Sequence, residues 1–334
     1  MTLKRGRRTL VGGIMAVVVA GWCAAAMPAA AKGTGYVFVS NTRANSVTVL
    51  DGKSYAVVKT IPVGDRPQGM AFTPDKARLL VVSGRKHRLD VIEIGTLALG
   101  EPLPAGEYPE MVAVDPSGER AYVSNEESGA VSVVDIAGRR IAGEIKTGPE
   151  PEGVILAPDG ALAFVAVEGG GALAVIDAAA GRAAGRIEVG PKPRRLALAK
   201  DGAELWVTTE AAGAVQIVAV AERKRIATIG FEPPGAKKED IRPVGIAIAA
   251  DGGRAYVALS RAERVAVIDA ASRRTIAYWT AGGRPIDVAL SRDGARLLVA
   301  NAMSDDLTVI DTATGKALAT AKVGRSPHSV VVDE

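Results

Sequence analysis

Carboxylates recur at regular positions in this sequence and are of a type that can ligate metal ions or transfer protons. Five of them close short apolar runs such as Val-Ile-Asp: Asp51, Asp135, Asp177, Asp269 and Asp311. Each precedes a turn such as Asp311-Thr-Ala-Thr-Gly-Lys316, in which the carboxylate can accept hydrogen bonds from the amides of its own turn. Because the same residue repeats in the same local setting, the pattern indicates a scaffold role for these aspartates.

Metal, haem and phosphate sites are not indicated. The two histidines, His87 and His328, form no pair with metal-ligand spacing. Cys23 is the single cysteine, and the sequence has neither a C-x-x-C-H haem-attachment motif nor a glycine-rich phosphate loop before a helix. We therefore predict no metal site, no bound cofactor and no known catalytic motif.

Other positions vary where the rest of the sequence repeats. A proline recurs along the chain, and the residue after it is Gln68, Glu110, Glu152, Arg194, Val244, Ile286 or His328. A scaffold role does not explain such variety at equivalent positions. Together with neighbouring loop residues, the variable positions predict a polar binding rim made of Arg66, Gln68, Glu110, Glu152, Arg194, Arg284 and His328. Such a rim fits a small polar ligand or a protein partner, and an ordinary solvated loop face is the alternative.

The spacing of these prolines identifies the elements that must position the rim. Pro67, Pro109, Pro151, Pro193, Pro243, Pro285 and Pro327 follow one another at intervals of 42, 42, 42, 50, 42 and 42 residues. Within one unit, the runs Ala121–Ser124, Ala130–Val134, Arg140–Ile145 and Glu152–Leu156 read as strands separated by turn residues. Seven such units predict an all-β fold, a seven-bladed β-propeller of four-stranded blades.

The two ends of the repeat region predict how the ring closes. The first strand, Tyr36–Ser40, matches the second strand of a blade, and the last, His328–Val332, matches the first. We expect the C-terminal strand to complete the first blade, which removes an open sheet edge. Four aromatic residues share one slot in successive blades and are predicted to pack between blades: Tyr122, Phe164, Trp206 and Tyr256.

The N-terminus predicts export. Basic residues precede an apolar run from Leu10 to about Ala20, and Ala29-Ala30-Ala31 offers a cleavage site. We predict a signal peptide over residues 1–31, cleavage after Ala31, a single propeller domain over residues 32–334 and a periplasmic location. The leader carries the whole excess of Lys and Arg over Asp and Glu, 41 against 37, so the mature chain is about neutral. Neutral charge argues against nucleic acid, and we expect a monomer without membrane insertion.

Several motifs resemble a known repeat family. The runs Tyr122-Val123-Ser124-Asn125 and Leu298-Val299-Ala300-Asn301, with Val267-Ile268-Asp269, resemble the YVTN family of β-propeller repeats over residues 35–334. The chain also resembles a seven-repeat periplasmic subgroup associated with PQQ-dependent alcohol oxidation and an ABC transport system. This resemblance implies a quinoprotein dehydrogenase or a transporter component as partner.

Two functions are compatible with the sequence. The first is a non-enzymatic binding or scaffold protein whose rim recognises a periplasmic partner or a small polar ligand. The alternative is a hydrolase, such as a lactonase, whose site lies where the rim surrounds the mouth of the propeller's central channel. Its site residues would be Glu110, Glu152, Arg194 and His328. The insertion at residues 230–242 is expected on the face of the propeller that carries the rim. It could serve as a lid or a docking element, or be a tolerated loop without a function.

Overall fold

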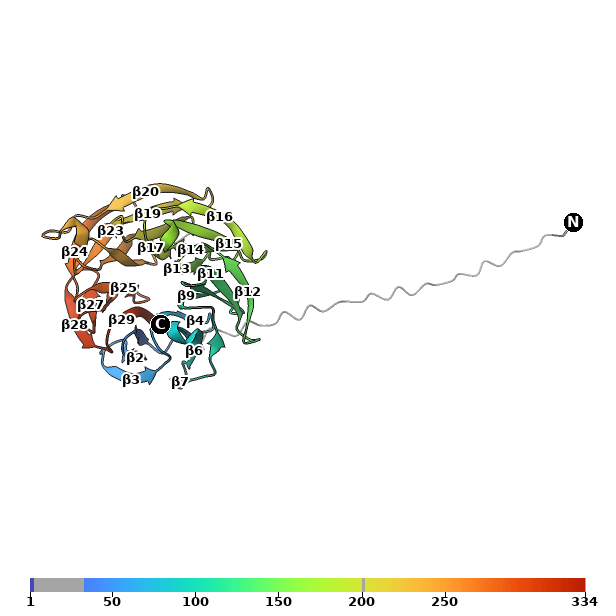
Figure 1. The fold of residues 1–334 in the computed structure, drawn as a ribbon, viewed down its shortest axis with the longest axis horizontal. Coiled ribbons are helices and arrows are strands. Elements are labelled where there is room, and N and C mark those ends of the chain that lie inside the picture. The colour runs from blue at the N-terminus through green and yellow to red at the C-terminus, as the bar shows by residue number, and fades with distance from the viewer. Residues whose placement is uncertain (3–32, 200–201, 334) are drawn as a thin grey trace.

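Seven antiparallel sheets surround a central axis in the computed structural model, which describes residues 1–2, 33–199 and 202–333 (Figure 1). Apart from residues 1–2, the predicted signal peptide lies outside the described residues, as does its cleavage site. The seven-bladed propeller predicted from the repeats is confirmed. Within the described residues, no helix is long and apolar enough to cross a membrane.

Each blade runs from an innermost to an outermost strand. Blade 1 contains β29 (Pro327–Asp333), β1 (Tyr36–Asn41), β2 (Ser46–Asp51) and β3 (Val57–Pro62). Blade 2 contains β4 (Pro67–Phe72), β5 (Arg78–Ser83), β6 (Arg88–Glu93) and the short β7 (Ala98–Leu99) and β8 (Leu103–Pro104). Blade 3 contains β9 (Pro109–Val114), β10 (Arg120–Asn125), β11 (Ala130–Asp135) and β12 (Arg140–Lys146).

The other four blades follow the same plan. Blade 4 contains β13 (Pro151–Leu156), β14 (Leu162–Val167), β15 (Ala172–Asp177) and β16 (Arg182–Glu188). Blade 5 contains β17 (Pro193–Leu198), β18 (Glu204–Thr209), β19 (Ala214–Ala219) and β20 (Lys224–Gly230). Blade 6 contains β21 (Pro243–Ile248), β22 (Arg254–Leu259), β23 (Arg264–Asp269) and β24 (Arg274–Thr280). Blade 7 contains β25 (Pro285–Leu290), β26 (Arg296–Asn301), β27 (Asp306–Asp311) and β28 (Ala317–Lys322).

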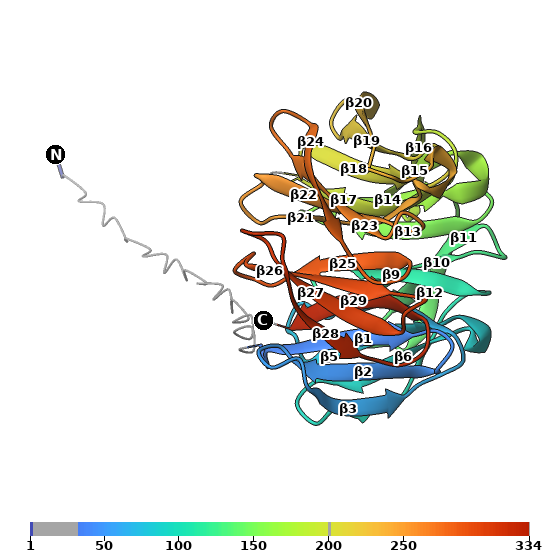
Figure 2. The same cartoon turned by 90° about the vertical axis from the view of Figure 1, so that its left-hand side faces the viewer.

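The ring closes as expected, because β29 from the C-terminus pairs antiparallel with β1 (Figure 2). Tyr36 lies opposite Asp333, and the side chain of Asp333 accepts hydrogen bonds from the amide and hydroxyl of Thr34 at 2.8 and 2.7 Å. The two ends of the domain are therefore joined by backbone and side-chain bonds, and β29 supplies the innermost strand that blade 1 would otherwise lack.

The core lies between blades. Alternating Val, Ile, Leu and Ala side chains from neighbouring sheets form clusters that each span two adjacent blades. The aromatic residues of the shared slot are at most 2% exposed, which confirms their predicted packing: Tyr122, Phe164, Trp206 and Tyr256. Because each blade packs against the next, the ring is rigid enough to hold polar side chains at its centre.

The recurring aspartates bind their own turns, as predicted. Asp135 accepts a hydrogen bond from the amide of Gly138 at 2.7 Å, and Asp311 accepts one from the amide of Thr314 at 2.9 Å. The pKa of the Asp51 carboxyl is lowered mainly by the hydrogen bond from the amide of Ser54, and next by the bond from the hydroxyl of Ser54. These carboxylates are thus engaged in the scaffold.

Candidate functional site

The start of every innermost strand carries a β-bulge. In blade 5, Pro193 lies opposite Thr209 and Leu196 opposite Val207, so two residues, Arg194 and Arg195, face the single residue between them. The same shift occurs at the marker proline of each of the seven blades. A bulge interrupts the strict alternation of a strand and can aim consecutive side chains to one side.

The second residue of the bulge is glycine in three blades, and the packing explains why. A Cβ added to Gly69 would lie 2.9 Å from the Cα of Met111, and one added to Gly245 would lie 2.6 Å from the Cα of Asp287. A Cβ on Gly153 would collide with the carbonyl oxygen of Arg194. These glycines let adjacent innermost strands approach each other. In the other four blades the second residue of the bulge has a side chain, and these residues are Met111, Arg195, Asp287 and Ser329.

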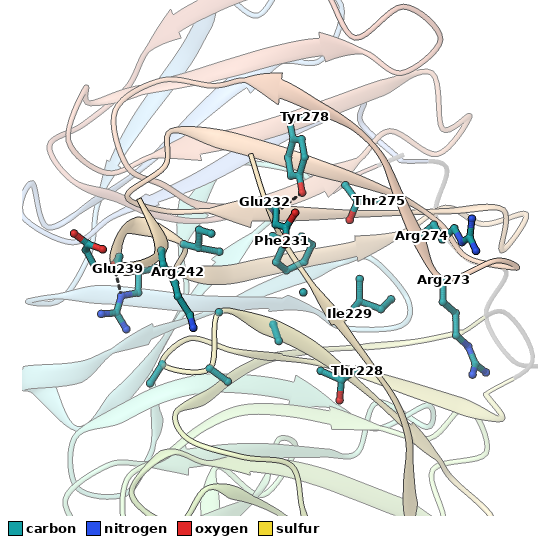
Figure 3. Close-up of a pocket in the computed structure, with 17 residues that line it drawn as sticks. Thr228, Ile229, Phe231, Glu232, Glu239, Arg242, Arg273, Arg274, Thr275 and Tyr278 are labelled. Atoms are coloured by element: carbon teal, nitrogen blue, oxygen red, sulfur yellow. Dashed lines mark hydrogen bonds between the residues drawn. The ribbon is translucent and has the colours of Figure 1, made fainter. Parts of the chain in front are cut away.

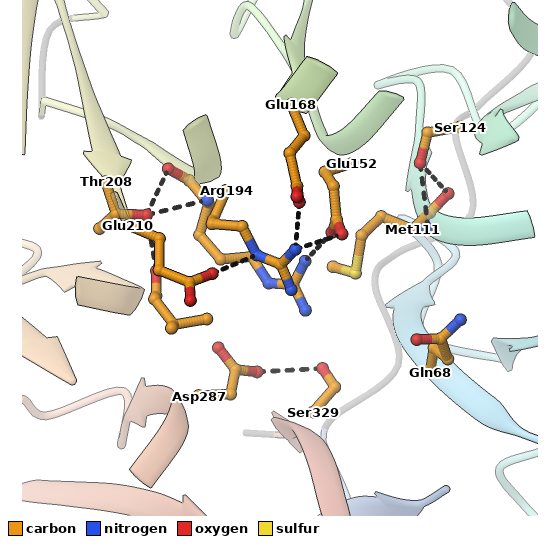
Figure 4. Close-up of polar contacts among 12 residues, drawn as sticks. Gln68, Met111, Ser124, Glu152, Glu168, Arg194, Thr208, Glu210, Asp287 and Ser329 are labelled. Carbon is orange, nitrogen blue, oxygen red and sulfur yellow. Dashed lines mark hydrogen bonds and ion pairs between the residues drawn. The ribbon is translucent and has the colours of Figure 1, made fainter. Parts of the chain in front are cut away.

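Arg194 joins glutamates from neighbouring blades (Figure 4). Its Nη1 lies 2.6 Å from Oε1 of Glu152 and also bonds Glu168, while its Nε lies 3.6 Å from Oε2 of Glu210. Burial opposes the charge of Arg194, but the three glutamates outweigh it and raise the pKa of the guanidinium. Lys192 adds a bond of 2.8 Å to Glu168. Arg194 and Glu152 were both predicted to lie at one rim, and in the structure they are in contact.

Arg195 was missed by the sequence analysis and lies deeper. The residue is 6% exposed, and its Nη1 lies 3.5 Å from Oε2 of Glu152. Its Nε, Nη1 and Nη2 have no hydrogen-bond partner within the described residues. A buried guanidinium with free donors is uncommon, since buried polar groups in folded proteins are nearly always hydrogen-bonded. The signal in the sequence was a charged residue at a position that is glycine in three other repeats.

Glu110 lies beside this cluster and is 4% exposed. Burial, reinforced by the neighbouring carboxylates of Glu152 and Glu126, raises its pKa to about 8, although a hydrogen bond with Gln68 acts in the opposite direction. The carboxyl is therefore protonated at neutral pH and can donate a hydrogen bond, as the amide of Gln68 can.

Two groups from blades 1 and 7 complete the centre. Burial lowers the pKa of His328, with Arg195 and Arg194 adding to the effect, so the imidazole is neutral, and its buried Nδ1 has no partner within the described residues. Asp287 accepts bonds from the hydroxyl of Ser329 at 3.0 Å and the amide of Val330 at 3.1 Å. Burial raises the pKa of Asp287 despite the nearby charge of Arg195.

The remaining predicted rim residues lie further out. Arg66 stacks over the ring of Tyr108, with its Cζ 5.1 Å from the ring centroid, and bonds the phenol oxygen. Arg284 is exposed and forms no ion pair with the described residues. Five of the predicted rim residues thus lie together at the centre, and Arg66 and Arg284 lie at its periphery. We call the central group the channel-mouth cluster, and it consists of Gln68, Glu110, Glu152, Arg194, Arg195, Asp287 and His328.

The insertion at residues 230–242 forms a separate groove of about 1000 Å³ with the outer strands of blades 5 and 6 (Figure 3). Phe231 and Ile241 are 5% and 8% exposed and pack in the core cluster between these blades. The amide of Glu232 donates a bond of 2.7 Å to the hydroxyl of Tyr278. The insertion is therefore anchored to the blades by both its ends.

The described residues contain no cluster of three His, Cys, Asp or Glu side chains arranged as metal ligands. The polar groups of the channel-mouth cluster are instead guanidinium, imidazole, amide and carboxyl groups, and the guanidinium groups are cationic. Such a set suits hydrogen bonding to a polar molecule.

Comparisons with known proteins agree on the fold. Residues 230–334 match the family model described as YNCE-like β-propeller, and a search of curated proteins found no match. Hydrazine synthase of Kuenenia stuttgartiensis is 24% identical, with a TM-score of 0.77 over 84% of this chain and 93% of that chain. A periplasmic gluconolactonase of Pseudomonas aeruginosa is 22% identical, with a TM-score of 0.75 over 90% and 99%. A functionally unknown protein from Desulfotomaculum acetoxidans is 14% identical, with a TM-score of 0.78 over 90% and 99%. The chain is accordingly a seven-bladed β-propeller whose C-terminal part matches the YNCE-like model.

Proposed function

We propose that this protein is a non-enzymatic binding propeller of the periplasm whose channel-mouth cluster holds a small polar ligand. The observation that carries the proposal is a set of buried polar atoms that form no hydrogen bond within the described residues: three nitrogens of Arg195, Oε2 of Glu152, which lies 3.5 Å from Nη1 of Arg195, and Nδ1 of His328. Leaving one buried polar group unpaired costs about 1–3 kcal/mol. A ligand with its own donors and acceptors would recover that cost.

The charges around the cluster support a partner protein as well. Arginines dominate one cavity at the rim, where Arg43, Arg66, Arg85 and Arg325 surround Asp65. Glutamates dominate the next cavity along the rim, which includes Glu126, Glu127 and Glu150. A rim that is basic on one side and acidic on the other can orient a partner of matching charge pattern.

We also propose the pathway and the compartment in which this protein acts. The resemblance to the subgroup associated with PQQ-dependent alcohol oxidation suggests an accessory role there, with a quinoprotein dehydrogenase or an ABC transporter component as partner. The N-terminal sequence, with its basic residues and apolar run, suggests the periplasm as the place of contact.

Affinity capture from periplasm tests the accessory role. Tagged protein is expected to retain a dehydrogenase or a transporter component, and a variant with reversed charges in the acidic rim cavity, Glu126→Lys with Glu150→Lys, is expected to retain less. A matched control reverses Glu222, an exposed turn residue on the outer side of blade 5. Repeated capture of neither partner by the wild-type protein would refute the accessory role.

One observation favours an enzymatic alternative. Glu110 and Glu152 are neighbouring carboxyls of which the first has its pKa raised to about 8. A carboxyl that is kept protonated near neutral pH beside a second carboxyl group can serve as a general acid. A hydrolase, for example one acting on a lactone, would lose turnover in Glu152→Gln while the fold is retained. A screen of small esters and lactones without any turnover by the wild-type protein would exclude this alternative.

A further inference from the structure

We propose that the ligand of the channel-mouth cluster is a small hydroxycarboxylate, with its carboxylate held by Arg195 and its hydroxyl held at His328. This inference rests on the proposed binding function and names the chemical class that the cluster fits. Arg195 is a buried guanidinium whose three nitrogens form no hydrogen bond within the described residues.

Arg195 has the geometry to take a carboxylate. Its planar guanidinium presents a fork of donors that matches two carboxylate oxygens. Glu152 approaches Nη1 at 3.5 Å, too far for a hydrogen bond by ordinary criteria, and it is already bonded at 2.6 Å to Arg194. Nη1 of Arg194 bonds both Glu152 and Glu168, whereas none of the three guanidinium nitrogens of Arg195 forms a hydrogen bond within the described residues.

The charge balance favours a monoanion over a dianion. Three cations, Lys192, Arg194 and Arg195, face the three carboxylates of Glu152, Glu168 and Glu210. Glu110 is held neutral below about pH 8, so it adds no negative charge at neutral pH. The cluster is thus close to neutral without a ligand: a carboxylate would add one negative charge beside Glu152, whereas a phosphate dianion would add two and be repelled more strongly.

The neutral groups of the cluster specify a hydroxyl. The neutral imidazole of His328 has one nitrogen that donates and one that accepts, and its buried Nδ1 forms no hydrogen bond with the part of the chain that the structure describes. A hydroxyl can both donate and accept, so it complements this nitrogen in either tautomer. A ligand that carries a carboxylate and a hydroxyl could therefore bond both the guanidinium nitrogens of Arg195 and Nδ1 of His328, none of which forms a hydrogen bond within the described residues.

The groups around Glu110 set the pH range in which an anion can bind. Glu110 on β9 faces Gln68 on β4, Glu152 on β13 and Glu126 in the loop after β10. Above about pH 8 its ionisation adds a negative charge next to Glu152. Affinity for a carboxylate is expected to fall across that pH range because the two anions repel each other.

Calorimetric titration with three two-carbon probes tests the ligand class. Glycolate has a carboxylate and a hydroxyl, acetate lacks the hydroxyl, and ethylene glycol lacks the carboxylate. We expect glycolate to bind at pH 7 with about tenfold higher affinity than acetate, the effect of one hydrogen bond of ~1.4 kcal/mol. Ethylene glycol is expected not to bind. Tighter binding of inorganic phosphate than of glycolate would overturn the charge argument.

Variants of Arg195 test the residue that carries the inference. Arg195→Gln is expected to lower glycolate affinity by about tenfold to a hundredfold, as for the loss of a charge-assisted pair. Arg225→Gln removes the same charge from the exposed outer strand of the same blade and is expected to have no effect. Arg195→Lys keeps the charge without the fork and is expected to give an intermediate affinity, which provides a second test should the Gln variant misfold.

The outcomes separate this inference from the proposed function. If the wild-type protein binds none of the carboxylates but still captures a dehydrogenase or transporter component, the hydroxycarboxylate is refuted and the accessory role stands. If it binds glycolate but captures neither partner, the ligand class stands and the accessory role is refuted. Equal affinity of wild type and Arg195→Gln for glycolate would refute the assignment of Arg195.

Discussion

Glu110→Gln is the substitution whose effect on stability follows most directly from the structure. The carboxyl is buried, and its pKa is raised from 4.5 to about 8 by burial and by the carboxylates of Glu152 and Glu126. The unfolded chain releases this proton near pH 4.5, whereas the folded protein keeps it until about pH 8. Between these values the folded state binds more protons, so the free energy of unfolding decreases as pH rises.

The size of the effect follows from the difference between the two pKa values. Each pKa unit corresponds to ~1.4 kcal/mol, so an increase from 4.5 to about 8 corresponds to a loss on the order of 5 kcal/mol between pH 4.5 and 8. Glutamine has nearly the same shape as a protonated glutamate and does not ionise. We expect Glu110→Gln to match the wild type at pH 4.5 and to be more stable by several kcal/mol at pH 9.

Urea denaturation at pH 4.5, 6, 7.5 and 9 measures this difference. Other groups that titrate in the range are present in both proteins, so their contributions cancel in the comparison. Glu222→Gln, in an exposed turn, is the matched control, and its stability is expected to run parallel to the wild type. If the curves of Glu110→Gln and wild type are parallel from pH 4.5 to 9, Glu110 is not held protonated by the fold, and the reasoning fails.

Three further predictions concern the scaffold around the cluster. Gly153→Ala is expected to cost about 1–3 kcal/mol in urea denaturation because its Cβ would collide with the carbonyl of Arg194, whereas Gly143→Ala, which has open space, should cost less. Thr208→Val is expected to cost about 1–3 kcal/mol in the same assay, because it removes a bond of 2.7 Å to the carbonyl of Val244 and leaves buried backbone groups unpaired. Deletion of residues 327–334 opens the ring and is expected to remove most of the ~5–15 kcal/mol that stabilises a folded domain, and addition of that segment as a peptide should raise the midpoint of thermal unfolding again.

The fold was predictable because its determinants are local and repeated. Each repeat contains its own alternating strands and its own aspartate turns, and the first and last strands of the region differ in their place within the repeat. These features predicted the blades, the bonding of the aspartates and the pairing of β29 with β1. The interrupted outer strand of blade 2 was not predicted, although Pro102 and Pro104, which lack an amide hydrogen, are typical of such a break.

The candidate site was predictable only in part, because its geometry depends on a backbone irregularity. In a regular strand, neighbouring residues point to opposite sides, so a reading by alternation assigns Arg194 to the rim and Arg195 elsewhere. The bulge after Pro193 makes both residues reach Glu152. The side chains of Glu168 and Glu210 come from loops of two different blades, and their convergence on Arg194 follows from the ring as a whole.

The bulge also accounts for the different side chains that the blades present at the channel mouth. It lies at the axis, where the innermost strands crowd one another and where Gly69, Gly153 and Gly245 are needed to let them approach. The larger residues Arg195 and Asp287 stand at equivalent positions in other blades, and their side chains occupy the centre rather than the interface between sheets. Substitution at these positions changes the charge and hydrogen bonding of the channel mouth while the packing between blades is preserved. The second bulge position is therefore where we expect ligand specificity to be set in propellers built on this repeat, and exchange of Arg195 for glycine should abolish binding with little loss in the free energy of unfolding.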